Sequence, residues 1–152
     1  MAREPAPVRG DYSFFRPIQV RWGDYDLLGH INNVQYIRYW EYMVVQFVGE
    51  ECGESWTRGA AIPFAAENSC RFLRPLNAGP LGPVGITLEA GLRIERIGTS
   101  SVHYALSLFE PEVAEAAATG AWVHVWVDTK THRPVPIPDE ARMAYERHVM
   151  ER

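Results

Sequence analysis

The chain has 152 residues, of which 47% are hydrophobic and 22% charged, and its formal net charge is −4. This composition is typical of one globular domain, and the negative balance gives no reason to expect a nucleic acid or an anionic membrane as partner. No stretch is long and apolar enough for a membrane span and the N-terminus lacks the apolar core of a signal peptide, so a cytoplasmic protein is expected.

The chain begins with an irregular arm and then enters its first strand. We interpret 1–152 as a single domain, because no linker or repeat divides it. The arm at 1–13 is rich in proline, alanine and charge and shows no periodicity. Alternating apolar residues then predict a strand at 18–22, which Gly23 ends before a polar turn at 24–33.

A long helix is predicted at 34–48, directly after this turn. Its apolar residues recur at three- and four-residue spacing: Val34, Ile37, Trp40, Val44, Phe47 and Val48. Since tyrosines and other apolar residues cover most of its remaining surface, the helix is expected to be buried nearly all round. Asn32 or Asn33 can cap its N-terminus, and Gly49 can supply a left-handed stop.

Four further strands are predicted, at 61–76, 84–97, 102–108 and 120–128. The first has an irregular middle, the second and third should form a hairpin, and the last is bulky on both faces, which is typical of a central strand or a subunit contact. A short helix at 139–148, capped by Asp139, ends the chain. An antiparallel sheet of these five strands can curl around the long helix, so the predicted fold class is α+β with a hotdog-like architecture, one sheet face being left to solvent or a partner.

The polar turn carries the most specific motif in the sequence. The motif runs Trp22-Gly23-Asp24-Tyr25-Asp26-Leu27-Leu28-Gly29-His30-Ile31-Asn32-Asn33, followed by Tyr36, Tyr39 and Glu41. It resembles the hotdog-fold acyl-CoA thioesterases of the 4-hydroxybenzoyl-CoA thioesterase type, whose pattern is D-x-D-x-x-G-H-x-N-N-x-x-Y-x-x-Y-x-E. The segments Phe72-Leu73-Arg74-Pro75-Leu76 and 133–138 match this family in outline.

The resemblance implies hydrolysis of the thioester of an acyl-CoA or an acyl carrier protein. It also implies an active site shared between the subunits of a homodimer or a dimer of dimers, with no metal and no organic cofactor. One departure is the His-x-Asn-Asn segment, which aryl-CoA members of this type usually lack and which argues against an aromatic substrate.

By resemblance, Asp26 is the catalytic carboxylate and the backbone amide of Asn33 polarises the thioester carbonyl. A carboxylate can act as a general base toward water or attack the carbonyl directly, and the sequence does not decide between these routes. Free N–H groups in a first helical turn are suited to a developing oxyanion. The structural alternative is that Asp26 is only a turn residue and that both asparagines are only caps.

The predicted substrate-binding residues are Gly29, His30, Asn32, Tyr36, Glu41 and Arg74. Gly29 would let the backbone pass close to the substrate, and His30 would hold the turn, contact substrate or protonate the leaving thiolate. Tyr36 would line an acyl tunnel or the core, and Glu41 would position water if burial raised its pKa, or pair with Arg38. Arg74, like Arg71 and Arg133, is a candidate for the coenzyme A phosphates or for ordinary surface charge. Asp24 is expected to orient the turn.

Other chemistries fit the sequence less well. His103 and His124 are expected as a solvent-facing or subunit-interface pair on neighbouring strands, without metal-ligand spacing. Cys52 and Cys70 lack a flanking motif and there is no G-x-S-x-G elbow, so a serine or cysteine nucleophile is disfavoured. The alternative functions are a hotdog hydratase or dehydratase that acts on an acyl thioester, and a non-catalytic binder of acyl-CoA.

Overall fold

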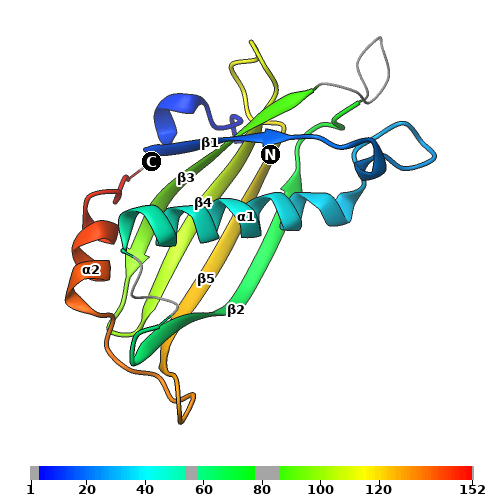
Figure 1. Cartoon of the computed structure of the whole chain (residues 1–152). Helices are drawn as coiled ribbons and strands as arrows, with labels where there is room; N and C mark the ends of the chain where they lie inside the picture. Colours follow the sequence, from blue (N-terminus) through cyan, green and yellow to red (C-terminus); the bar gives the residue numbers. More distant parts are fainter. Residues whose placement is uncertain (1–3, 54–57, 78–85, 152) are drawn as a thin grey trace.

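The computed structural model describes residues 4–53, 58–77 and 86–151 (Figure 1). Its elements in chain order are the 3-10 turn η1 (Arg9–Asp11), β1 (Phe14–Gln19), the 3-10 turn η2 (Trp22–Asp24), α1 (Asn33–Glu51), β2 (Ala61–Phe72), β3 (Thr87–Ile97), β4 (Ser101–Phe109), β5 (Ala118–Asp128) and α2 (Asp139–Glu146). All strand pairs are antiparallel, and the order across the sheet is β1-β3-β4-β5-β2. The predicted α+β hotdog fold, one long helix against a five-stranded sheet, is thus confirmed. None of the helices in the described ranges is long and apolar enough to cross a membrane.

Helix α1 lies across one face of the sheet (Figure 1) and fits it closely at one point. The Trp40 side chain is fully buried, and its indole N–H donates to the backbone carbonyl of Ser107 at 3.2 Å. A Cβ on Gly120 of β5 would lie 2.6 Å from the Trp40 ring, so only glycine leaves room for the indole there. This contact fixes the position of α1 along the sheet.

The helix is less completely buried than its composition predicts. One strip faces solvent and consists of Val34, Arg38, Glu41, Tyr42 and Val45. The helix also runs through Gly49 and ends at Glu51, with Cys52 as its C-cap, and the glycine with positive φ that follows it is Gly53, at +83°. The prediction that Gly49 stops the helix is therefore wrong: the additional turn allows Cys52 to be buried in the core.

The first strand starts and ends earlier than predicted. β1 covers 14–19, and Trp22 belongs to η2, where its side chain is largely exposed. Phe14 enters the main core, whereas Phe15 packs on the other sheet face, where the arm places Tyr12 against Phe109. Because Phe14 and Phe15 are both bulky and pack on opposite faces of the sheet, the sequence does not show here the alternation of apolar and polar residues that predicts a half-buried strand.

The remaining strands and α2 agree with the predictions except in detail. β2 has its irregularity between Ala65 and Glu67, and β3 and β4 form the hairpin. The predicted start of the third strand at 84–85 and arm residues 1–3 lie outside the described residues. β5 is an interior strand, as one of its two interpretations predicted. Asp139 is the first residue of α2 and not its cap, because Pro138 holds the cap position.

His103 and His124 do not form the expected pair. In the β4–β5 register His124 lies opposite Val102, and His103 lies opposite Val123, so the two histidines point to opposite faces of the sheet. His124 is buried beside the Tyr104 hydroxyl, 3.1 Å from its Nδ1. Burial lowers the pKa of His124 to about 4, so the imidazole is neutral at physiological pH.

Candidate active site

The turn that precedes α1 is a tight hairpin held by its own backbone. The Asn32 N–H donates to the Asp24 carbonyl at 2.8 Å, and the Asp26 N–H donates to the His30 carbonyl at 2.9 Å. The Gly29 N–H closes the tip by donating to the Asp26 carbonyl at 3.1 Å. Gly29 has φ +74°, and a Cβ there would meet no atom within 4 Å, so glycine is favoured for its backbone conformation and not for space.

The Asp26 carboxylate is held by one of its two oxygens. Oδ1 accepts the Leu28 N–H at 2.9 Å and the His30 N–H at 3.3 Å, both from the same turn. Within the described part of the chain, Oδ2 has no hydrogen-bond or ion-pair partner, and the residue is partly exposed. The turn thus orients the carboxylate and leaves one oxygen available to a water molecule or an electrophile.

The N-terminus of α1 lies at the end of the same turn. The Asn32 side chain is the cap, because its Oδ1 accepts the Val34 N–H at 3.0 Å. The Gln35 N–H donates to the Asn32 carbonyl at 2.9 Å. The exposed Asn33 N–H has no acceptor among the residues that the structure covers, so it is a free donor at the positive end of the helix.

A buried hydrogen bond ties this turn to the helix. Asp24 is only 2% exposed, and its Oδ2 accepts the Tyr39 hydroxyl at 2.7 Å and the Arg21 backbone N–H at 2.9 Å. Burial and this hydrogen bond raise the pKa of Tyr39 well above its ordinary value. Tyr39 therefore keeps its proton and donates a hydrogen bond to a carboxylate that is shielded from water. The sequence indicated that Asp24 orients the turn but gave no sign of its partner, which lies in the second turn of α1.

The structure brings only some of the predicted site residues together. Gly29, His30 and Asn32 share the turn with Asp26, and His30 also bridges to Asn77, just beyond β2.

Tyr36 is buried with the core residues, and its ring centroid lies 4.9 Å from that of the exposed Phe72 on β2. Burial raises the pKa of Tyr36 to about 12, and the charge of Asp26 contributes to the rise. Glu41 is exposed and not buried as its expected role in positioning water requires, and among the residues described it does not pair with Arg38. The Arg74 guanidinium pairs with the Glu110 carboxylate at 3.0 Å and with the Glu115 carbonyl.

The cysteines and potential metal ligands offer no competing centre. Burial raises the pKa of Cys52 to about 12 and that of Cys70 to about 11, so neither thiol is a thiolate nucleophile at neutral pH. Across 4–53, 58–77 and 86–151, no three or more His, Cys, Asp or Glu side chains are grouped so that they could hold a metal ion.

Comparison with known proteins gives a consistent result. The family model of the thioesterase-like superfamily matches residues 20–145. The chain is similar to the PA5185 protein of Pseudomonas aeruginosa, with 37% identity, a TM-score of 0.86 and coverage of 95% of this chain and 97% of that one. A search among curated proteins found no match.

Two further solved structures are similar to this chain over most of their length. A putative thioesterase from the same organism, the PA2801 protein, has 30% identity, a TM-score of 0.73 and coverage of 86% of this chain and 95% of that one. A thioesterase from Thermus thermophilus, complexed with coenzyme A and zinc, has 25% identity, a TM-score of 0.73 and coverage of 90% and 94%.

Proposed function

Because the chain belongs to the thioesterase-like superfamily, we propose that it hydrolyses acyl-CoA thioesters to a free acid and coenzyme A, with Asp26 and the N-terminus of α1 as its catalytic groups. Hydrolysis of a thioester is the reaction class that this family supports, and coenzyme A is the carrier bound by the similar Thermus thioesterase. The assignment of residues rests on one observation: within the described ranges, the turn before α1 presents an Asp26 carboxylate with one unbonded oxygen and, at its end, an Asn33 N–H without an acceptor.

The chemistry needs only these two groups. On the first route, Oδ2 of Asp26 takes a proton from water while the water oxygen adds to the thioester carbonyl carbon. The Asn33 N–H then donates to the oxyanion, and its collapse breaks the C–S bond. The thiolate leaves with the proton held by Asp26 or one supplied by the His30 imidazole. No metal or organic cofactor takes part in this scheme.

On the second route, Oδ2 itself attacks the carbonyl and expels the thiolate, and water then attacks the aspartyl carbonyl carbon of the mixed anhydride and releases the acyl carboxylate. A single turnover in ¹⁸O-water separates the two routes. Heavy oxygen recovered in the Asp26 side chain requires the anhydride, whereas the general-base route leaves that side chain unlabelled.

The decisive experiment follows thiol release from a panel of short, long, branched and aryl acyl-CoAs. Asp26→Asn keeps the hydrogen-bond acceptor but removes the base, so we expect its kcat to fall by about 10²–10⁴. Asp139→Asn, an exposed first-turn residue of α2, is the matched control and should hydrolyse like wild type. Equal rates for Asp26→Asn and wild type would refute the assignment. A change in the acyl chain's double bonds without thiol release would indicate the hydratase reaction.

We also propose that the enzyme is a homodimer that assembles through β2. This strand is at the edge of the sheet, and among the described strands it pairs only with β5. Phe64 and Phe72 are exposed on it. A long exposed edge strand is a template for pairing with another chain. Sedimentation at micromolar concentration tests the dimer, and a strict monomer would contradict it.

A further inference from the structure

One strip of α1 faces away from the sheet and carries three apolar and two charged side chains. Its apolar members Val34, Tyr42 and Val45 are 60%, 50% and 39% exposed. The charged members, Arg38 and Glu41, lie between the two valines. Since the opposite side of the helix packs on the sheet (Figure 1), this strip is the part of α1 that an approaching molecule meets first. Apolar groups that gather in water on one helix face indicate a surface that a partner covers.

The two charged residues of the strip are open to such a partner. Arg38 and Glu41 are three positions apart, a spacing at which opposite charges on a helix often pair. Within the described residues, however, neither side chain forms an ion pair or a side-chain hydrogen bond. Glu50, farther along α1, is by contrast paired with Arg16. The strip therefore offers one positive and one negative charge to a molecule that approaches this side of the helix.

The sequence of the strip is complementary to itself. When two α1 helices run antiparallel about a twofold axis that passes between positions 39 and 40, Arg38 of each helix lies opposite Glu41 of the other. The same axis places Val34 of each helix opposite Val45 of the other. Two contacts between opposite charges then form at the centre, and a contact between valines forms at each end. A second copy of this chain is thus a partner that matches the strip in charge and in polarity.

The strip is too small to hold two single chains together. Val34 and Val45 are eleven positions apart, which is roughly 16.5 Å along the helix axis, and the strip is one helix face wide. A stable interface buries about 800 Å² on each partner, more than such a strip provides. In the proposed β2 dimer, a twofold axis perpendicular to the sheet keeps both α1 helices on the same side, so the dimer presents two strips in one direction. Two dimers can therefore meet at two strips, and the first contact raises the effective concentration for the second.

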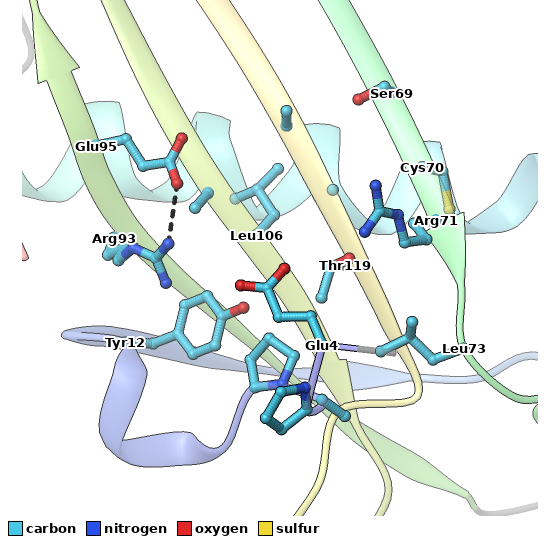
Figure 2. A pocket seen from close by; sticks show the side chains of 16 residues that line it. Glu4, Tyr12, Ser69, Cys70, Arg71, Leu73, Arg93, Glu95, Leu106 and Thr119 are labelled. Carbon is cyan, nitrogen blue, oxygen red and sulfur yellow. Dashed lines mark hydrogen bonds and ion pairs between the residues drawn. The ribbon is translucent and has the colours of Figure 1, made fainter. Parts of the chain in front are cut away.

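The opposite face of the sheet is a less suitable surface, because the chain's own N-terminal arm covers part of it. Figure 2 shows the hollow of about 410 Å³ beneath this arm, with Glu4 and Tyr12 from the arm and Arg71 from β2 among the residues that line it. Arg93 of β3, at the same hollow, already pairs with Glu95 at 2.9 Å. No segment within the described ranges covers the strip of α1 in this way. The strip is therefore the more accessible surface for a second dimer.

We propose that the α1 strip binds the α1 strip of a second copy, so that two β2 dimers assemble face to face into a tetramer. The proposal rests on the β2 dimer proposed above and not on the hydrolytic activity. Each tetramer contains two helix pairs, and each pair contributes two contacts between Arg38 of one copy and Glu41 of another. Four such contacts act together, which compensates for the small energy of any one exposed ion pair. Charge reversal at either residue turns all four attractions into repulsions.

Sedimentation equilibrium of the full chain at low ionic strength measures this assembly directly. Wild type should have the mass of four chains. Arg38→Glu should have the mass of two, because its dimer–tetramer dissociation constant rises about a hundredfold when the four contacts become repulsive. Arg38→Glu combined with Glu41→Arg restores opposite charges at every contact and should return to four chains. Arg133→Glu, on the exposed turn after β5, is the matched control and should keep the wild-type mass.

Mixing two variants separates a contact between copies from an effect within one helix. Arg38→Glu and Glu41→Arg should each stop at two chains. In an equimolar mixture, the negative strips of one variant meet the positive strips of the other, so tetramers with one dimer of each variant should form. Misfolding cannot imitate this recovery, because it requires both variants to be folded. A mixture that stays at two chains would overturn the proposal.

The masses also separate this proposal from the β2 dimer and from hydrolysis. A wild-type mass of two chains that Arg38→Glu leaves unchanged would overturn the strip contact while the β2 dimer stands. A tetramer that Arg38→Glu does not dissociate would overturn it as well. A wild-type mass of two chains that Arg38→Glu reduces to one would refute the β2 dimer and the tetramer built on it. Because no substrate is present, failure of wild type to release thiol from acyl-CoAs would refute hydrolysis and leave these masses unchanged.

Discussion

Replacing Tyr39 by phenylalanine removes the hydroxyl that donates to Asp24 and changes nothing else in the shape of the side chain. Asp24 is 2% exposed, so water cannot replace the lost donor. Among the described residues, the carboxylate then keeps only the Arg21 backbone N–H and a long contact with the Arg21 guanidinium. Loss of a hydrogen bond to a buried charged group costs about 1.5–3 kcal/mol of unfolding free energy. For a domain of this size that corresponds to a fall in Tm of about 3–12 °C.

Tyr25→Phe is the matched control on the same turn. The Tyr25 hydroxyl is buried and has no hydrogen-bond partner in the described part of the chain, so its removal relieves an unsatisfied group. We expect the free energy of unfolding to stay unchanged or to rise by up to about 1 kcal/mol. Thermal and urea unfolding measure both variants under identical conditions.

A positioning role adds a kinetic expectation. Because Tyr39 sets the turn that carries Asp26 against α1, Tyr39→Phe should lower kcat about tenfold at a temperature where both variants are fully folded. The expected pattern is a loss of kcat in Tyr39→Phe and none in Tyr25→Phe. If Tyr39→Phe loses no more stability than Tyr25→Phe, the Asp24–Tyr39 hydrogen bond does not hold the turn and the reasoning fails.

Two further predictions concern stability. The pKa of buried His124 falls from 6.5 to about 4 in the folded protein. The neutral His124 therefore contributes about 3 kcal/mol to the free energy of unfolding, in full above pH 6.5, and this contribution is lost as the pH falls toward 4. When the urea midpoint is measured against pH, His124→Phe should lack this decrease, whereas His132→Asn should retain it. Gly29→Ala places a Cβ at φ +74° and should lower the free energy of unfolding, measured in urea, by about 1–2 kcal/mol. Gly23→Ala, a position without positive φ, should lower it much less. Equal losses in the two variants would show that positive φ is not the reason for glycine at position 29.

The fold was predictable because each of its main elements shows a regular spacing of apolar residues over many positions. The alternation along β3 and the three- and four-residue spacing along α1 each bury one face, and both elements lie where the sequence places them. Prediction failed where tertiary packing selects among locally equivalent choices. Gly49 and Gly53 are both possible helix stops, and burial of Cys52 decides for the second.

The candidate site shows the same division. The resemblance in the turn points to Asp26 and Asn33, and Asn32 as the cap follows from helix chemistry. The Asp24–Tyr39 hydrogen bond joins residues fifteen positions apart, across a turn and into a helix, and no local pattern encodes it. For β5, alternation predicts two sets of side chains on opposite faces but does not predict which set faces the core. His124 is buried because it shares a face with Trp122 and Trp126, which are buried in the core.

The two edges of the sheet differ in a way that limits growth of an assembly. β2 has twelve residues, whereas β1 has only six, and each strand contains one proline, Pro63 and Pro17, which has no N–H to donate. In the proposed dimer, two copies joined at β2 would each present only the six-residue edge strand β1 to a third copy. We therefore expect strand pairing in that dimer to terminate at two chains.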